Sequence, residues 1–320
     1  MKSQKLLVTG GAGFIGSSLV DRLLAADCEV VVVDDFNDYY DPALKRANVA
    51  AHVQHPKYRL VEADIREGER MAELVRSFAP DCIVHLAARA GVRPSLSDPM
   101  LYETTNAQGT LHLLEAARHA KVPKFVFASS SSVYGLNTKV PFAEGDPLLR
   151  PASPYGATKL ANEAMCHAYS HLYGLPIVSL RFFTVYGPRQ RPDLAIRKFA
   201  ERMLAGKPIE LYGDGSTSRD YTFIDDIIRG VVAAIELDAR GHEVFNLGNS
   251  SPVTLAELVR ALEDVLGVHA KIERLPEQPG DVPRTFADTT KAEQRLGFRP
   301  STPLDHGLEV FADWLRAQSK

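Results

Sequence analysis

The sequence of 320 residues contains no apolar run that approaches the ~20 residues needed to cross a bilayer. Its N-terminus carries basic residues but lacks the apolar core and cleavage site of a secretory signal peptide. It also lacks internal repeats and low-complexity tracts. These absences argue against a membrane protein, and we expect a protein that stays in the cytoplasm.

Cysteine is scarce, and an excess of positive charge is absent. The three cysteines, Cys28, Cys82 and Cys166, form no C-x-x-C pair, so we expect buried reduced thiols rather than disulfides or structural zinc. The ten histidines show no paired ligand spacing, which argues against a catalytic metal. With 37 basic and 40 acidic side chains, the net charge of −3 gives no general attraction to nucleic acid or an anionic membrane.

The composition is that of a globular protein, with 45% hydrophobic and 24% charged residues. The first half alternates short β-branched runs with amphipathic helical stretches. This alternation predicts βαβ units and an α/β fold with a doubly wound parallel sheet, the Rossmann type. The expected strands span residues 5–9, 29–33, 58–62, 83–86, 125–129 and 177–181, and the expected helices include 14–26, 99–120 and 154–173.

The pattern changes near Gly187, where loops rich in glycine and proline begin. We expect a smaller α/β C-terminal lobe that packs closely on the first and leaves a cleft between the two. A helix over 225–236 and a strand over 243–246 should return to the first sheet. Thr254 and Glu257 form a capping box for a later helix. The proline-rich tail predicts loops with short helices.

The segment GGAGFIG, residues 10–16, follows the first strand and opens the first helix. Glycines here permit a tight turn, allow the backbone to approach a pyrophosphate, and let the helix and strand pack closely. The helix N-terminus adds bare N–H donors, so the pattern predicts a dinucleotide site. Asp34 ends the second strand, where it can accept hydrogen bonds from the adenosine ribose and repel a 2′-phosphate, which favours NAD over NADP. Asp64 is either an adenine contact or a helix N-cap.

Tyr155 and Lys159 lie four residues apart in a predicted helix and therefore share one face. A phenol with a pKa of about 10 is a poor base at neutral pH. A nearby ammonium group and a positively charged nicotinamide would lower that pKa. A run of four serines, 129–132, ends the fifth strand at the edge where ligands bind in an open α/β sheet, although the run could also be plain loop.

Taken together, these segments resemble the extended short-chain dehydrogenases/reductases, and among them the nucleotide-sugar 4-epimerases. The resemblance covers essentially the whole chain. It rests on TGGAGFIG, HLAARAGVRPS, FASSSSVYG, SPYGATK, RFFTVYGPRQRPD, LYGDGSTSRDYTFIDD, FNLGNSSP and PGDVPRTFAD.

The resemblance implies a general base and acid at Tyr155, a ribose-binding and tuning role for Lys159, and a hydrogen bond from Ser130 to the reacting 4-hydroxyl. In the family, a hydride passes from sugar C4 to tightly held NAD⁺. The 4-keto sugar turns over in the pocket, and the hydride returns to its opposite face. The implied NAD contacts are Gly10, Gly13, Phe14, Ile15, Gly16, Asp34, Asp64, Ile65, Leu86, Ala87, Ala88, Tyr155 and Lys159.

The motifs indicate the sugar substrate less specifically than they indicate the family. Related 4,6-dehydratases carry an Asp-Glu pair just before V-Y-G, and uronate decarboxylases carry a Glu there, whereas this chain has Ser132. Both reactions are therefore disfavoured. Thr184, followed by Arg191 in the R-P-D segment, resembles UDP-glucuronate 4-epimerases, whose matching arginine approaches the C6 carboxylate. A guanidinium can bind a carboxylate in a bidentate manner, although Arg191 could also be an ordinary loop arginine.

Family members usually have Trp-Gly just before this arginine, whereas this chain has Arg189 and Gln190. This departure leaves UDP-glucose/UDP-galactose 4-epimerisation as the alternative to UDP-glucuronate 4-epimerisation.

The resemblance also implies how the substrate is held and how the chain assembles. Helices 99–120 and 154–173 match those that family members use to form a homodimer. The expected domains are 1–187 with 222–249 for NAD and 188–221 with 250–320 for the nucleotide sugar. The implied substrate contacts are Arg219 with the diphosphate, Asp281 with the uridine ribose, Tyr212 with uracil, Arg93 with phosphate or sugar, and Ser131, Ser132, Thr184 and Arg191.

Overall fold

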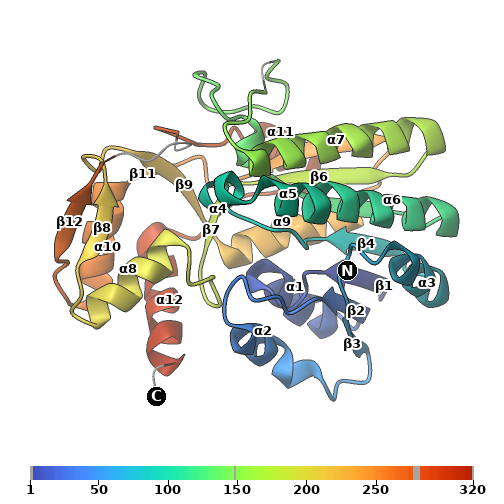
Figure 1. Cartoon of the computed structure of the whole chain (residues 1–320), viewed down its shortest axis with the longest axis horizontal. Helices are drawn as coiled ribbons and strands as arrows, with labels where there is room; N and C mark the ends of the chain where they lie inside the picture. Colours follow the sequence, from blue (N-terminus) through green and yellow to red (C-terminus); the bar gives the residue numbers. More distant parts are fainter. Residues whose placement is uncertain (1–2, 148, 277–281, 319–320) are drawn as a thin grey trace.

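The computed structural model describes residues 3–147, 149–276 and 282–318 (Figure 1). Its largest unit is a seven-stranded sheet with the order β10-β6-β5-β4-β1-β2-β3, in which every neighbouring pair is parallel. The predicted doubly wound sheet is therefore confirmed. Its strands are β1 (Lys5–Thr9), β2 (Glu29–Asp34), β3 (Tyr58–Glu62), β4 (Cys82–His85), β5 (Phe125–Ser130), β6 (Ile177–Phe182) and β10 (His242–Leu247).

The sheet is covered by helices on both faces, and the sequence of β2 shows why. Its four consecutive valines are all buried, because Val30 and Val32 pack into the core on one face while Val31 and Val33 pack into the core on the other. Figure 1 shows the helical layers on either side. The helices are α1 (Phe14–Ala25) and α9 (Ile224–Glu236) on the first face, and α3 (Gly68–Phe78), α6 (Gly109–Ala120) and α7 (Pro154–Tyr173) on the second.

The strand order reverses between β1 and β4, because β1 pairs with β2 on one side and with β4 on the other. Ligands bind outside the carboxyl ends of the strands at such a switch point. We therefore expect the ligand site at the loops that follow β1, β4 and β5.

A smaller lobe lies beside the carboxyl ends of the sheet, at the left of Figure 1. It contains a three-stranded sheet, β11-β9-β7, and a parallel pair, β12-β8. The division of the chain into two domains stays a prediction, and β9 spans its proposed boundary at residues 221 and 222. The elements are β7 (Thr184–Tyr186), β8 (Ile209–Tyr212), β9 (Ser218–Phe223), β11 (Pro252–Thr254), β12 (Ile272–Leu275), α8 (Ala195–Leu204), α10 (Leu255–Leu266) and α12 (Leu304–Gln318).

The remaining elements border the cleft or connect the larger ones. The expected helix over 99–120 is one helical stretch whose middle is a π-helix rather than an α-helix. These elements are α2 (Pro42–Val49), η1 (Ala50–His52), α4 (Val92–Ser97), α5 (Pro99–Tyr102), the π-helix η2 (Glu103–Gln108), η3 (Ser131–Val133) and α11 (Thr290–Leu296).

Several local predictions differ from the structure in instructive ways. The fourth strand ends at His85, so Leu86 belongs to the following loop, although its N–H still bonds the Thr9 carbonyl at 3.2 Å. The tail does not contain only short helices, because α12 has 15 residues and buries an apolar stripe that includes Leu308 and Phe311. The capping box of Thr254 at the start of α10 is confirmed. In the described ranges, no helix is long and apolar enough to cross a membrane.

Candidate functional site

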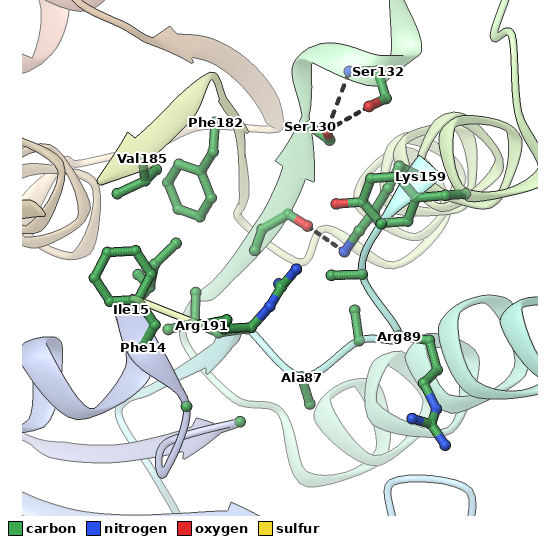
Figure 2. A pocket seen from close by; sticks show the side chains of 18 of the residues that line it. Phe14, Ile15, Ala87, Arg89, Ser130, Ser132, Lys159, Phe182, Val185 and Arg191 are labelled. Atoms are coloured by element: carbon green, nitrogen blue, oxygen red, sulfur yellow. Dashed lines mark hydrogen bonds between the residues drawn. The ribbon is translucent and has the colours of Figure 1, made fainter. Parts of the chain in front are cut away.

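A cavity of about 470 Å³ lies where the carboxyl ends of the parallel strands face the smaller lobe. Its walls come from the loops after β1, β2, β4 and β5, from the start of α7, and from segments around β7 and β9. Figure 2 shows Phe14 and Ile15 on one side of this cavity and Ser130 and Lys159 on another. The cleft expected between the two lobes is therefore present.

The glycine turn after β1 has a shape that side chains would destroy. Gly10 has a φ of +68°, and a Cβ at this position would lie 2.8 Å from the backbone of Ala87. A Cβ on Gly16 would lie 2.1 Å from the Gly10 carbonyl oxygen. The N-cap of α1 is Gly13, which offers no side-chain cap, so the first N–H groups of the helix remain available to an anion. This cradle fits the pyrophosphate of a dinucleotide.

Asp34 lies at the end of β2 and is buried beside the same cavity. Its carboxylate accepts hydrogen bonds from the N–H groups of Ala12 at 3.2 Å and Phe36 at 3.0 Å. The Lys45 ammonium lies 3.4 Å from one carboxylate oxygen. Burial raises the pKa of Asp34, and Lys45 opposes this effect. Lys45 is buried, lines the cavity and was missed by the sequence analysis, because it belongs to α2 and carries no motif.

Asp64 lines the cavity but does not cap the following helix. The N-cap of α3 is Glu67, while the Asp64 carboxylate accepts hydrogen bonds from the backbone and guanidinium of Arg66. Burial would raise the pKa of Asp64, but these bonds dominate and the net shift is downward. The N-cap interpretation of Asp64 is therefore wrong, and the contact with adenine stays a prediction.

The loop after β4 is fixed from behind by a residue that the sequence did not reveal. Asn106, on the π-helix, accepts a hydrogen bond from the Arg89 N–H at 2.8 Å and donates one to the Arg89 carbonyl at 3.0 Å. The Arg89 side chain lines the cavity and was also missed. The same loop places the predicted residues Leu86, Ala87 and Ala88 along the wall, where Ile65 also lies.

Tyr155 and Lys159 extend from the first turns of α7, which is well anchored. Ser153 caps this helix by accepting the Gly156 N–H at 3.1 Å. Lys159 is almost fully buried and donates to the Ala128 carbonyl at 2.7 Å, and burial lowers its pKa to about 7.

Burial dominates the electrostatics of Tyr155. It raises the pKa of the phenol, while the Ser130 hydroxyl and the Arg191 guanidinium act in the opposite direction. Lys159 lies 6.0 Å from the Tyr155 ring centre. Desolvation outweighs the effects of Ser130 and Arg191, and the tuning of Tyr155 by Lys159 together with a nicotinamide stays a prediction.

Ser130 lies at the end of β5, where its hydroxyl accepts the Ser132 N–H at 3.1 Å and lies 3.2 Å from the Ser132 hydroxyl (Figure 2). A buried ion pair supports this strand end from behind. Arg181 on β6 binds Glu163 of α7 with two hydrogen bonds, at 2.9 and 2.7 Å, and Ser129 donates to the same carboxylate. The Arg181–Glu163 ion pair and the Ser129 hydrogen bond therefore fix the end of β5 that carries the serines.

The predicted substrate residues fall into three groups. Ser131, Ser132, Thr184, Arg191 and Arg219 line the cavity. Arg93 and Tyr212 are not among the described lining residues, and the Arg93 guanidinium instead stacks on the Tyr212 ring at 4.3 Å. Asp281 lies outside the described residues.

Apolar side chains close the cavity near Arg191. Phe182 and Val185 face it opposite Lys159, with Phe14 and Ile15 below them in Figure 2. Across the ranges that the structure covers, no group of three histidine, cysteine or acidic side chains is arranged to hold a metal ion.

Comparisons with known proteins agree with this geometry. A family model described as GDP-mannose 4,6 dehydratase matches residues 7–311. UDP-glucuronate 4-epimerase 4 of Arabidopsis thaliana is 43% identical over 327 residues, which cover 97% of this chain and 74% of that protein.

Solved structures show the same similarity along the whole chain. UDP-glucuronic acid 4-epimerase from Bacillus cereus, solved with UDP-glucuronic acid and NAD, is 40% identical with a TM-score of 0.93, and the match covers 98% of this chain and 99% of that one. UDP-glucose 4-epimerase from Thermotoga maritima, solved with UDP-glucose, is 34% identical with a TM-score of 0.91, and the match covers 99% and 100%. The chain therefore belongs to the GDP-mannose 4,6 dehydratase family of short-chain dehydrogenases/reductases, within which it is related to the UDP-sugar 4-epimerases.

Proposed function

We propose that this chain is an NAD-dependent 4-epimerase that converts UDP-glucuronate to UDP-galacturonate. The observation that carries the choice of sugar is the position of Arg191, whose guanidinium lies in the same cavity as Tyr155, Lys159 and Ser130. An arginine there can bind the C6 carboxylate of a uronate while the 4-hydroxyl faces the tyrosine.

The glycine turn, Asp34 and Lys159 would hold NAD, with its pyrophosphate at the N-terminus of α1. When bound, NAD⁺ supplies the hydride acceptor and, after reduction, the hydride donor at sugar C4. The Tyr155 oxygen takes the proton of the 4-hydroxyl and, after the 4-keto sugar has turned over, returns it to the oxygen on C4. Ser130 donates a hydrogen bond to the same sugar oxygen. Because the hydride leaves and returns, only the configuration at C4 changes.

The Tyr155 phenolate has to be stabilised in a site whose burial opposes it. Ser130 and Arg191 favour the phenolate, and the positive charge of an oxidised nicotinamide would act in the same direction. General base catalysis by such a group contributes about 10²- to 10⁴-fold to the rate.

At the departure from the family pattern, Arg189 and Gln190 make contacts within the protein. Gln190 is buried and donates to the Val185 carbonyl at 3.1 Å, and Arg189 reaches Asp21 of α1 at 2.8 Å. Neither residue is among the described lining residues. The feature that left a neutral hexose open therefore weighs little against a uronate.

The absence of a carboxylate before Val133 disfavours dehydration and decarboxylation. We infer that Ser131, Ser132, Thr184 and Arg219 contact the nucleotide sugar from the cavity wall. The roles of Arg93, Tyr212 and Asp281 stay predictions.

We also infer that two copies of the chain associate through α7 and its neighbours. Met100, Met165, Leu172 and Tyr173 are exposed apolar side chains on α5 and α7, and covering them would stabilise a dimer. Light scattering during size exclusion tests this assembly, and a monomer at micromolar concentration would argue against it.

The function is tested by incubating the protein separately with UDP-glucuronate, UDP-glucose and UDP-N-acetylglucosamine and identifying the products by NMR. We expect UDP-galacturonate from the first and little change in the others. Replacing Tyr155 with phenylalanine should leave bound NAD in place and lower turnover by about 10²- to 10⁴-fold. Turnover of UDP-glucose alone would replace the uronate assignment with the hexose one, and loss of water would indicate a dehydratase.

A further inference from the structure

We propose that Asp193 is a positioning residue that aims Arg191 at the substrate carboxylate and thereby suppresses decarboxylation of the intermediate. The proposal rests on the proposed function, because it concerns a uronate substrate. A 4-keto uronate is a β-keto acid. Breaking its C5–C6 bond releases CO₂ and sends the bonding electrons to the C4 ketone oxygen as an enolate, which then takes a proton at C5.

The contact between the two residues is a complete bidentate pair. Arg191 donates from Nε to one Asp193 oxygen at 2.9 Å and from Nη2 to the other at 2.8 Å. This use of one edge of the planar guanidinium fixes the direction of the other. No described residue accepts a hydrogen bond from Nη1. The Nη1–Nη2 edge is therefore able to bind a second carboxylate, in a direction set by Asp193.

Asp193 acts on Arg191 from outside the described cavity lining, where its own side chain is exposed to solvent. It is not among the described residues that line the cavity, whereas Arg191 is. Figure 2 shows Arg191 reaching into the middle of the space, on the side of Lys159 and Ser130. Of these two residues, Arg191 is therefore the one to which we assign direct contact with the sugar.

The larger lobe, which contains the seven-stranded sheet, also contacts the Arg191–Asp193 pair. The Tyr39 hydroxyl, from the loop between β2 and α2, donates to Asp193 at 3.4 Å. The Arg191 guanidinium lies 5.5 Å from the centre of the Tyr39 ring. Tyr39 thus contacts both members of the pair from the side of the larger sheet, which restricts the rotation of the arginine.

Orientation matters because decarboxylation requires the C5–C6 bond to align with the ketone π system. A carboxylate held on a fixed edge of Arg191 keeps that bond in one direction relative to the sugar ring. Asp193 also contributes a negative charge, so it does not strengthen the attraction for the substrate carboxylate. Its removal should therefore damage geometry more than affinity.

The test compares Asp193→Asn with the wild-type chain, both saturated with NAD and supplied with UDP-glucuronate. We expect the variant to keep KM within about threefold, to lose about tenfold in kcat, and to release several-fold more CO₂ per epimerisation. Decarboxylation leaves a 4-keto pentose, and whenever this product leaves the site before it is reduced, the hydride stays on the cofactor. The near-ultraviolet absorbance of reduced nicotinamide should therefore grow with the CO₂ released.

Two further variants of the chain serve as controls. Asp313→Asn changes an exposed aspartate that pairs with Arg316 on α12 and should behave as wild type. Asp193→Glu keeps a carboxylate and should recover part of the product ratio. Thermal unfolding of each variant shows that the fold is retained.

The possible results distinguish a failure of the proposed function from a failure of the role proposed for Asp193. Wild-type chain that leaves UDP-glucuronate unchanged overturns the proposed function and the role of Asp193 with it. Active wild type together with an Asp193→Asn variant of unchanged kcat and product ratio overturns the role of Asp193 alone. A variant that only raises KM also overturns it, because the aspartate would then serve affinity rather than orientation.

Discussion

Replacing Lys159 with methionine should change how the stability of the cofactor-free chain depends on pH. Burial lowers the pKa of Lys159 to about 7, whereas an unfolded lysine titrates near 10.4. Between these values the folded amine is neutral and the unfolded amine is protonated. Unfolding therefore takes up a proton, and the free energy of unfolding rises with pH by at most about 1.4 kcal/mol per pH unit.

The sign follows from the direction of the shift. The stability contributed by a neutral Lys159 is fully present above the unfolded pKa and is lost as pH falls towards the folded pKa. From about pH 7 to about pH 9, the contribution of this group should grow by about 2 kcal/mol. The methionine variant lacks this dependence, so any stability advantage it has over wild type should shrink by the same amount.

Urea unfolding followed by circular dichroism, with NAD removed, measures the two free energies at several pH values. Comparing two proteins cancels the titration of every group they share. Lys207→Met, which removes an exposed lysine from the other lobe, controls for the loss of one cation. Parallel pH curves for wild type and Lys159→Met would refute the claim that burial sets the protonation of this amine.

Three other substitutions test the supports of the site. Gly16→Ala places a Cβ 2.1 Å from a backbone carbonyl, so thermal unfolding should show a loss of about 1–3 kcal/mol and NAD titration at least a tenfold weaker affinity. Glu163→Gln leaves Arg181 buried without a full counter-charge, and urea unfolding should show a cost of about 3–5 kcal/mol. Lys45→Met removes the cation beside Asp34, so burial would then favour the neutral, protonated form of Asp34. Calorimetry should therefore show that NAD binding is about tenfold weaker. Unchanged values would contradict each argument.

The parts of the fold that the sequence could predict are those governed by local pattern. The valines of β2 are buried on both faces, and such a run is typical of a parallel sheet whatever surrounds it. Gly10 and Gly16 are required by steric contacts within one turn and its neighbouring loop. The strands of the smaller lobe were harder to predict, because β12 is largely exposed and gains its place by pairing with β8.

The residues missed in the site act across elements that are distant in the sequence. Lys45 approaches Asp34 only because α2 folds back over the end of β2. Asn106 reaches the Arg89 backbone from a π-helix, and no spacing rule links these two positions. Conversely, Arg93 and Tyr212 have residue types that suit a nucleotide, yet the Arg93 guanidinium lies over the Tyr212 ring and neither residue is among the described residues that line the cavity. Composition and spacing identify which chemistry is available, but packing decides which side chains face the cavity.

The two cations near Tyr155 have different consequences for the chemistry. Lys159 is bonded to the Ala128 carbonyl and titrates near neutrality, so in the cofactor-free chain it brings little fixed charge to the phenol. Arg191 stays charged, but a bound uronate carboxylate would share its charge with Asp193. With a uronate in place, the phenolate therefore depends more on Ser130 and on the oxidised nicotinamide than it would with a neutral hexose. Proton removal is then coupled to the redox state of the cofactor: the charge of an oxidised nicotinamide would lower the pKa of Tyr155 and favour its phenolate, and loss of that charge on reduction would raise the pKa, so that Tyr155 keeps the proton until the hydride goes back to C4.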